Sequence, residues 1–503
     1  MVRERIAFVI SQIGRGEAGK YSRRRVGKQV ERCSCMEKLG TDMSTWAEAL
    51  MDGIDIDKFI VCTYIVCLPY DYENVFASIA KVIAEEQSIG TWTHVPGETP
   101  EVRRRFIGKV LQCVEIPQYE VIRPDRKNRE PFGDKQIPLI PYLVTIGYPA
   151  DLFNDDNFSL VLTSIYGNIS MVGPIRLVSV RFGKETMNRY KGPTFGLEGI
   201  YNKLKIPLAP DKATRPLTIN MIKPKTGYTK DVGKKIFWEA AIGGVDIIKD
   251  DEMIANCPQM DNALEERVPL YMEMRDKKMA ETGEETIYTV NISDRMDRML
   301  EMYDKVVSLG GNGVMINYIN CGWSCVKPLT DKGKLIMLGH TDGGGAYYVS
   351  PMSGISSDLV LGIFPRMLGI DMPLVPAPYA KAPYIVDRYL QLCKSLTMPL
   401  GYGDNQLKAC LPFPSGGIQT QHIPQLVKDL GPNIGVGTGG GIHAHPMGTI
   451  AGAKAFRQAF DACMAGEFDL KKYAKEKNLQ ELAVSLGMME MAHDGLKTMM
   501  KKK

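Results

Sequence analysis

The chain has 503 residues, of which 44% are apolar, so it is long enough to bury a large core in each of two domains. Its 62 basic and 58 acidic residues are interspersed and leave a net charge of +4, which argues against nucleic-acid and membrane partners. The eleven cysteines show neither a disulfide framework nor zinc-ligand spacing, which favours free thiols in the cytoplasm.

The N-terminal part of the chain predicts a mixture of strands and helices. Residues 58–68 form an apolar run typical of a strand, and this run is only about half as long as a membrane span. Residues 72–86 have a helical pattern, and residues 160–169 are interpreted as a strand that presents Asn168 near its end. Charged residues follow Met1, so we expect no signal peptide. Residues 1–50 and 117–141 are longer than this pattern needs, and we assign them no function.

From Pro216 onward, short apolar runs rich in β-forming residues alternate with helical patterns. Eight such βα units without an internal repeat predict a (β/α)₈ barrel, in which the active site lies at the C-terminal ends of the strands. The predicted strands are residues 217–223, 245–249, 287–291, 314–318, 335–339, 372–376, 410–413 and 434–438.

The second predicted barrel strand ends in Lys249, which Asp250, Asp251 and Glu252 follow at once. Side chains alternate along a strand, so Lys249 and Asp251 share a face that Glu252 can reach from the loop. Mg²⁺ requires oxygen ligands, and Lys249 can supply one only if its neutral amine captures CO₂ and becomes a carbamate. Taken alone, this segment fits an acidic helix N-terminus equally well, because carboxylates are common there.

Two further lysines, Lys223 and Lys225, follow the first predicted barrel strand and project to one side of it. A lysine near other cations or in a dry site has a lowered pKa, so this pair could stabilise an enolate and move its protons beside a metal. The alternative is a pair of surface lysines whose ammonium groups are solvated.

Glycine-rich loops follow the last two predicted strands. Ser415, Gly416 and Gly417 come after the seventh strand, and a segment that includes Gly439 and Gly440 comes after the eighth. Backbone amides of such loops, near a helix N-terminus, form the usual phosphate site of this fold. Glycines also occur in ordinary tight turns, but their presence after both strands favours a phosphate site.

Together these motifs resemble the RuBisCO large-subunit superfamily over residues 58–466. The resemblance is carried by residues 88–93, 166–168, 221–225, 243–252, 415–417 and 439–441, followed by His445 and Pro446. It implies an α/β fold with an N-terminal α+β, ferredoxin-like domain at 51–195 and a (β/α)₈ TIM barrel at 196–470, flanked by an extension at 1–50 and a helical tail at 471–503. It also implies a homodimer, in which the N-terminal domain of one copy covers the barrel mouth of the other.

The resemblance implies roles for individual residues. Lys249, as a carbamate, would bind Mg²⁺ together with Asp251 and Glu252. The catalytic residues would be Lys223, Lys225, His340, Lys381, Glu86 and Asn168, with Asn168 supplied by the neighbouring subunit. The phosphate of the substrate would bind to Thr91, Trp92, Ser415, Gly416, Gly417, Gly439 and Gly440.

Two departures distinguish this chain from the carboxylases of the family. The arginine after the fifth strand, which holds the second phosphate of a bisphosphate, is replaced by Thr341 or, in a register shifted by two residues, by Gly343. These registers place either His340 or Asp342 at the position of the catalytic histidine. The phosphate-binding histidine after the sixth strand falls on Leu374. A second phosphate dianion would therefore lack its partners, at a cost of several kcal/mol.

The chain thus resembles a form IV RuBisCO-like protein, a member of the non-carboxylating branch. We expect Mg²⁺-dependent enolisation or isomerisation of a sugar monophosphate similar to a methylthio-pentulose phosphate. The alternatives are the 2,3-diketo-5-methylthiopentyl-1-phosphate enolase of methionine salvage, a functional ribulose bisphosphate carboxylase, and a non-catalytic scaffold. Residues 364–379 are most similar to the methionine-salvage enolases, but Asn168 stands where those enzymes carry a lysine base.

Overall fold

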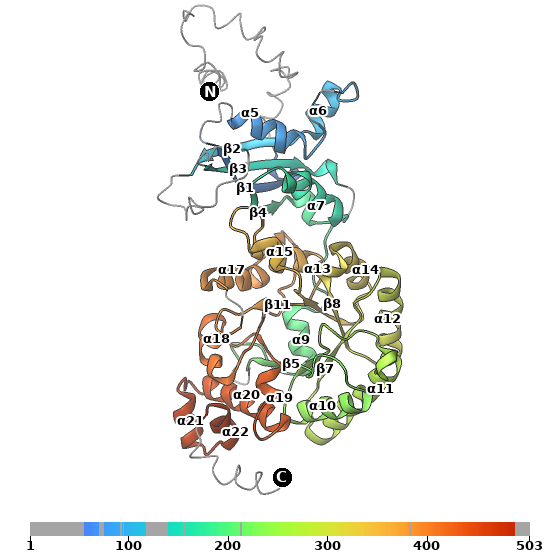
Figure 1. The fold of residues 1–503 in the computed structure, drawn as a ribbon, viewed down its shortest axis with the longest axis vertical. Helices are drawn as coiled ribbons and strands as arrows, with labels where there is room; N and C mark the ends of the chain where they lie inside the picture. The colour runs from blue at the N-terminus through green and yellow to red at the C-terminus, as the bar shows by residue number, and fades with distance from the viewer. Residues whose placement is uncertain are drawn as a thin grey trace, which may run out of the picture. The chain divides into compact units, whose positions relative to one another are not determined.

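The computed structural model describes residues 55–69, 75–90, 93, 95–116, 139–153, 156–211, 214–381 and 384–487. The chain divides into two compact units, which Figure 1 shows in ribbon form. The first unit comprises the chain up to Arg189 together with Ala346–Ser356, and the second comprises Tyr190–Gly345 and the chain from Ser357 onward. The extension at 1–50, residues 117–138, and the predicted phosphate ligands Thr91 and Trp92 lie outside the described residues.

The first unit contains a mixed five-stranded sheet. Its strands are β1 (Phe59–Pro69), β2 (Lys109–Glu115), β3 (Leu139–Pro149), β4 (Ile175–Phe182) and β10 (Gly354–Ile355). Their order in the sheet is β10-β4-β1-β3-β2, and all neighbours are antiparallel except β10 and β4. The predicted N-terminal domain of strands and helices and its first strand are thereby confirmed, whereas the contribution of β10 from the middle of the chain was not predicted.

Short helices accompany this sheet. They are α5 (Val75–Ile79), which continues as a π-helical turn over Ala80–Glu85, α6 (Pro100–Phe106), α7 (Phe158–Tyr166) and α8 (Lys184–Met187). Single 3₁₀ turns cover Ile56–Lys58, Ala150–Leu152 and Asn168–Met171.

Residues 160–169 were predicted to form a strand, and this prediction is wrong, because most of them belong to α7. The side chain of Asn157 caps the helix by accepting a hydrogen bond from the N–H of Leu160 at 3.0 Å. Three apolar residues at helical spacing are buried: Phe158, Val161 and Ile165. A short apolar run does not distinguish a helix from a strand, and here the cap and the buried face favour the helix. Asn168 consequently lies exposed in the 3₁₀ turn that follows.

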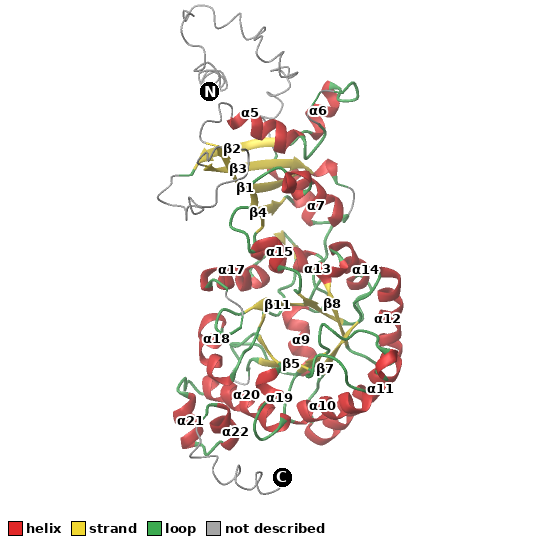
Figure 2. Ribbon diagram, in the orientation of Figure 1, coloured by secondary structure: helices red, strands yellow, loops and turns green. Residues whose placement is uncertain are grey.

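The second unit is a parallel barrel of eight strands surrounded by helices (Figure 2). The strands are β5 (Leu217–Met221), β6 (Ile247–Lys249), β7 (Ile287–Asn291), β8 (Gly313–Asn317), β9 (Ile336–His340), β11 (Met372–Pro376), β14 (Phe413–Ser415) and β15 (Gly435–Thr438). Their order is β14-β11-β9-β8-β7-β6-β5-β15. The N–H of Gly435 donates to the carbonyl of Pro412 at 2.9 Å, so the two end strands approach each other and the barrel is nearly closed. All eight predicted strands are confirmed, although the seventh begins at Phe413 and not at Cys410.

Except for α9, which precedes β5, the helices of this unit follow the strands in the order expected for βα units. They are α9 (Gly196–Leu204), α10 (Lys230–Ile242), α11 (Leu264–Thr282), α12 (Met296–Ser308), α13 (Tyr318–Cys321), α14 (Val326–Thr330), α16 (Phe364–Met367), α17 (Val386–Thr397), α18 (Ile423–Leu430), α19 (Gly440–His443), α20 (Thr449–Met464), α21 (Leu470–Glu476) and α22 (Gln480–Ser485). The division of the chain between the two units falls within α15 (Gly345–Tyr348), after Gly345. In the second unit, β12 (Gly401–Tyr402) and β13 (Asn405–Gln406) form a small hairpin.

The barrel interior is apolar, and α9 covers its N-terminal end. Side chains of α9, including Ile200 and Leu204, join one buried cluster with residues from most barrel strands. The hydroxyl of Tyr201 donates to the carbonyl of Arg215, just before β5, at 3.1 Å. The N–H of Gly196 donates to Asp371 Oδ1, just before β11, at 2.7 Å. Because α9 occupies this end, a site for chemistry is expected at the opposite, C-terminal ends of the strands.

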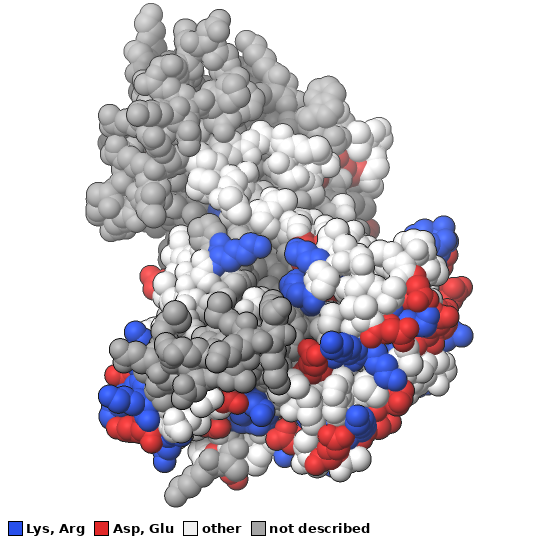
Figure 3. Space-filling view, turned by 60° about the horizontal axis from the view of Figure 1, so that its bottom comes forward, with Lys and Arg blue, Asp and Glu red and all other residues white. Residues whose placement is uncertain are grey.

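Charged side chains of both signs are interspersed over the lower part of the face shown in Figure 3. The coloured part of that face shows no continuous stripe of one sign. Among the described residues, no helix combines the length and apolarity that a membrane span requires.

Candidate active site

Three candidate metal ligands lie at the C-terminal end of β6. Lys249 ends the strand and is fully buried in the barrel wall, between β5 and β7. Its Nζ donates a hydrogen bond to the carbonyl of Asp250 at 2.8 Å and lies 3.7 Å from Glu252 Oε2. Asp251 is also fully buried, and the side chain of Glu252 is 21% exposed. The alternation along the strand thus brings the lysine and two carboxylates together, as the sequence predicted.

Lys223 and Lys225 extend from the end of β5 to the same two carboxylates. Lys223 forms an ion pair with Asp251, and Lys225 Nζ donates to Glu252 Oε1 at 3.1 Å. Three lysines and two carboxylates therefore meet at one edge of the barrel, and both Lys223 and Lys225 are ion-paired there, although the side chain of Lys225 is 54% exposed.

Burial determines the ionisation of the central lysine. It lowers the pKa of Lys249 to about 8, although the nearby Glu252 and Asp251 act in the opposite direction. An appreciable fraction of this amine is therefore neutral just above neutral pH, and the neutral form is the one that can react with CO₂. Burial raises the pKa of Glu252, but His340 and Lys249 outweigh it and lower the pKa to about 2, so this carboxylate stays ionised.

His340 is the last residue of β9, and its ring lies beside Glu252. Its Nε2 is 3.4 Å from Glu252 Oε2, and its Nδ1 is 2.9 Å from Asp342 Oδ1. The side chain of Asn320 donates a hydrogen bond to Asp342. Of the two registers that the sequence left open, the structure places His340 next to the candidate metal ligands and Asp342 on the other side of the ring.

The sequence did not predict that two asparagines hold the segment with the candidate ligands. Asn291 ends β7 and Asn317 ends β8. The amide of Asn291 donates to the carbonyls of Asp251 and Glu252 at 3.2 and 3.3 Å, and the amide of Asn317 donates to the carbonyl of Glu252 at 3.3 Å. Each is a polar residue at the end of a barrel strand, and this position was the signal that could have identified them.

One of the two glycine-rich loops lies close to Lys223, and the other lies beside Lys381. Gly416 and Gly417 have φ angles of +112° and +86°, which glycine adopts without strain. A Cβ atom at Gly439 would come within 2.9 Å of Lys223 Cε, so the loop after β15 is in contact with that lysine. The N–H of Lys381 donates to the carbonyl of Gly416 at 2.8 Å, which joins the loop after β11 to the loop after β14.

The remaining predicted residues are distributed over both units. Ser415 ends β14 and is buried, whereas Gly440 and Lys381 are exposed. Glu86 and Asn168 belong to the first unit, where Glu86 is partly buried at the end of the π-helical turn. The structure thus gathers the predicted metal, lysine, histidine and glycine residues of the barrel at its C-terminal end.

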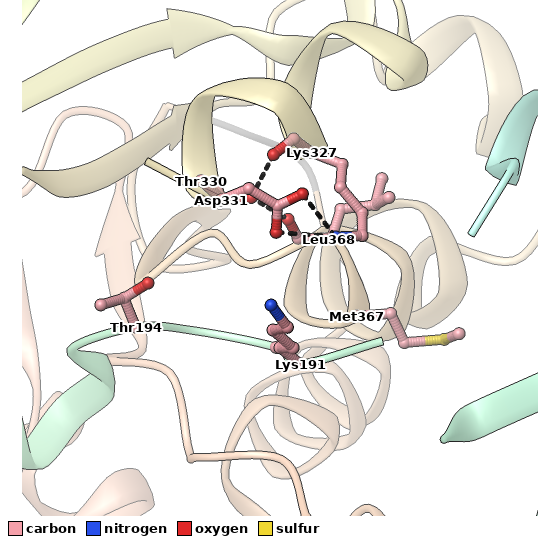
Figure 4. A pocket seen from close by; sticks show the side chains of 8 residues that line it. Lys191, Thr194, Lys327, Thr330, Asp331, Met367 and Leu368 are labelled. Carbon is pink, nitrogen blue, oxygen red and sulfur yellow. Dashed lines mark hydrogen bonds and ion pairs between the residues drawn. The ribbon is translucent and has the colours of Figure 1, made fainter. Parts of the chain in front are cut away.

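A separate small pocket is formed by segments that precede barrel strands (Figure 4). It has a volume of about 70 Å³ and is lined by Lys191, Gly192, Thr194, Lys327, Thr330, Asp331, Met367 and Leu368. Lys327 Nζ lies 2.7 Å from both carboxylate oxygens of Asp331 on its wall. None of the predicted site residues lines this pocket, so the cluster at the strand ends is the candidate active site.

Comparison with known proteins agrees with this arrangement. Residues 54–184 match the family model of the ribulose bisphosphate carboxylase large chain, N-terminal domain, and residues 204–375 and 402–488 match that of the catalytic domain. The ribulose bisphosphate carboxylase-like protein of Archaeoglobus fulgidus is 43% identical over 441 residues, which cover 87% of this chain and 95% of that protein. The 2,3-diketo-5-methylthiopentyl-1-phosphate enolase of Bacillus cereus is 30% identical over 410 residues, which cover 80% of this chain and 92% of the enolase.

The fold is similar to solved structures as well. The dimeric archaeal Rubisco from Hyperthermus butylicus has a TM-score of 0.72 and 26% identity, and the match covers 88% of this chain and 99% of that one. Because both domain models match and the full-length relatives agree, the chain belongs to the ribulose bisphosphate carboxylase large-chain family, within which it is similar to RuBisCO-like proteins.

Proposed function

We propose that this protein is a metal-dependent enolase or isomerase that acts on a sugar monophosphate and does not fix CO₂. The observation that carries the proposal is the full burial of Lys249 beside two carboxylates that also contact Lys223 and Lys225. Gathering so many charges in a partly buried place is costly in desolvation, and a catalytic or metal-binding role accounts for keeping them.

The donor set fits Mg²⁺ only if Lys249 is carbamylated. Asp251 and Glu252 supply two carboxylates, and the described part of the chain has no group of three His, Cys, Asp or Glu side chains that could hold a metal ion. A carbamate on Lys249 would add the third oxygen ligand, the kind that this hard cation prefers. When bound, Mg²⁺ would polarise the carbonyl group of a ketone substrate.

Lys223 and Lys225 would supply the acid and base groups. Lys223 contacts both Asp251 and the loop at Gly439, so it lies between the candidate metal ligands and the proposed phosphate loops. An amine there would take the proton from the carbon next to the carbonyl group, and an ammonium would protonate the resulting enolate. His340, on another side of Glu252, would provide a second group for proton transfer.

The substrate would bind through one phosphate. Gly416, Gly417, Gly439 and Gly440 would donate backbone hydrogen bonds to it, together with Ser415 and with Thr91 and Trp92 of a second copy. The opposite end of the substrate would meet Thr341 and Leu374, neither of which carries a cation for a second phosphate. This asymmetry favours a monophosphate whose other end is neutral.

We further propose a homodimer in which Glu86 and Asn168 of the partner complete the site. The dimeric Rubisco from Hyperthermus butylicus, which is similar over 88% of this chain, supports this assembly. Sedimentation of the full-length protein should give the mass of two chains or of a multiple of two.

A second candidate function is the 2,3-diketo-5-methylthiopentyl-1-phosphate enolase reaction of methionine salvage. It is favoured by the 30% identity to the Bacillus cereus enolase. Asn168, however, stands where those enolases carry a lysine base, so a different residue would have to remove the proton. A carboxylase is disfavoured by Thr341 and Leu374, and a non-catalytic scaffold by the retained cluster of charged residues.

A screen of sugar monophosphates for Mg²⁺-dependent exchange of a carbon-bound proton with deuterated water tests the proposal. We expect exchange with at least one ketose monophosphate, and a loss of about 100-fold or more in Lys223→Met, since this removes a group for proton transfer. Lys327→Met removes an ion-paired lysine remote from the cluster and should leave the exchange unchanged. Absence of exchange with every substrate, or formation of 3-phosphoglycerate from ribulose bisphosphate, would contradict the proposal.

A further inference from the structure

A line of polar side chains reaches His340 from the side opposite to Glu252. Asn320, in α13 after β8, donates a hydrogen bond to Asp342, in the loop after β9. The other carboxylate oxygen of Asp342 lies 2.9 Å from His340 Nδ1, and Nε2 of the same ring lies 3.4 Å from Glu252. Asn320, Asp342 and His340 thus form a continuous connection to the candidate metal ligand Glu252.

We propose that Asp342, held in place by Asn320, is a positioning residue that fixes the ring orientation and the tautomer of His340. It leaves Nε2 free to exchange protons with a substrate bound beside Glu252. The inference rests on the proposed function, because it concerns how a proton-transfer group of that reaction is held.

Two hydrogen bonds compete for His340 Nδ1. Nδ1 can donate to Asp342 Oδ1 at 2.9 Å, or it can accept from the backbone N–H of Asp342 at 3.3 Å. The bond to the carboxylate is shorter and charge-assisted, so it is the stronger of the two. The carboxylate of Glu252 also faces the ring, but it lies farther away, 3.4 Å from Nε2, so the nearer Asp342 places the proton on Nδ1. Without the carboxylate, only the backbone N–H remains, and Nδ1 would become an acceptor while the proton moves to Nε2. The side chain of Asp342 therefore decides whether Nε2, the nitrogen beside Glu252, is unprotonated and able to act as a base.

The backbone conformation at Gly343, after β9, leaves room for the hydrogen bond between Asn320 and Asp342. Gly343 has a φ angle of +83°, and a Cβ atom there would come within 2.5 Å of Asn320 Oδ1. A larger residue at this position would push Asn320 away from the carboxylate that it holds. The side chains of His340 and Asp342 are 13% and 27% exposed, so solvent only partly competes for their hydrogen bond.

Nitrogen NMR of the full-length protein labelled with ¹⁵N-histidine measures the tautomer directly. The chain has six histidines, and the signal of His340 is the one that disappears in His340→Gln. At a pH where the ring is neutral, with or without Mg²⁺ and bicarbonate, we expect the proton on Nδ1 in the wild type. In Asp342→Ala we expect it on Nε2. Asp331→Ala, which removes an aspartate bound to Lys327 remote from the cluster, should leave the signal unchanged.

A proton on Nε2 in the wild type, or an unchanged tautomer in Asp342→Ala, would overturn the proposal. Gly343→Ala provides a second variant that keeps the carboxylate but displaces its support, and it should give a mixture of the two tautomers. A pure Nδ1-protonated signal in Gly343→Ala would refute the part assigned to Asn320.

Kinetics with a substrate found by the exchange screen tests the same point independently. Asp342→Ala should lower kcat about 10- to 100-fold, because it removes a residue that orients a functional side chain. KM should change little, because Asp342 would not touch the substrate. In the His340→Gln background the same replacement should have almost no further effect. An equal loss in both backgrounds would overturn the proposal. If no substrate undergoes exchange, the proposed function fails, whereas the tautomer measured by NMR still decides the positioning role.

Discussion

The segment that carries the candidate metal ligands is anchored by a buried ion pair, and breaking this pair should destabilise the barrel strongly. Arg267 in α11 and Asp250 are both fully buried, with 2.9 Å between Arg267 Nη2 and Asp250 Oδ2. Asp250 also accepts hydrogen bonds from the hydroxyl of Tyr288 at 2.7 Å and from the N–H of Asn291 at 3.0 Å. Asp250→Ala would leave the guanidinium buried without its partner, at a cost of about 3–5 kcal/mol in the free energy of unfolding.

Urea unfolding of the metal-free protein, followed by circular dichroism, measures this loss. Arg267→Met should cost a similar amount, and the double variant should cost clearly less than the sum, because neither charge is then left alone. Asp297→Ala breaks an exposed pair with Arg295 and should cause no measurable change. A loss below about 1 kcal/mol in Asp250→Ala, or additive losses in the double variant, would refute the assigned role of the pair.

Two further predictions concern the phosphate loop and acid stability. A Cβ atom at Gly440 would meet no neighbouring group within 4 Å, so Gly440→Asp should fold normally. Like-charge repulsion should raise KM for the phosphorylated substrate about tenfold or more, which corresponds to about 1.4 kcal/mol per factor of ten. Gly440→Asn is the neutral control, and an unchanged KM in Gly440→Asp would refute the assignment of Gly440 to the phosphate site. At Asp246, burial raises the pKa, but Arg215 and Arg457 outweigh it and lower the pKa from 3.8 to about 2. The folded state therefore gains about 2 kcal/mol from this group above about pH 4, and the gain disappears as the pH falls towards 2. Urea unfolding at several pH values should show a flatter acid dependence for Asp246→Asn, and a dependence as steep as that of the wild type would contradict this.

The sequence predicted the barrel well because each strand is a short buried run that ends in a recognisable change of residue type. The seventh strand was predicted least accurately, because Cys410 to Pro412 are buried but only Phe413 to Ser415 pair with β11. In the first unit, α7 was mistaken for a strand because burial of an apolar run is compatible with both structures. The pairing of β10 with β4 joins residues far apart in the chain, and no local pattern encodes such a contact.

The candidate site was partly predictable for the same reason. Lys249, Asp251 and Glu252 lie within four consecutive residues, so strand geometry alone placed them together. The contact of Asn320 with Asp342 depends instead on how the loops after two different strands meet, and it became visible only in the structure. The same holds for Asn291, whose importance lies in its hydrogen bonds to the backbone of another loop.

Carbamylation of Lys249 is the central claim, and carbon NMR with ¹³C-bicarbonate and Mg²⁺ tests it most directly. Lys249→Arg keeps the positive charge but cannot form the carbamate. Lys278→Arg is the matched control, because Lys278 is another buried lysine whose pKa is lowered by burial, and it lies elsewhere, hydrogen-bonded to Thr286 at 3.0 Å. We predict a carbamate signal in the wild type and in Lys278→Arg, and none in Lys249→Arg. A wild-type protein without this signal, or a Lys249→Arg variant that retains it, would contradict the proposed metal site.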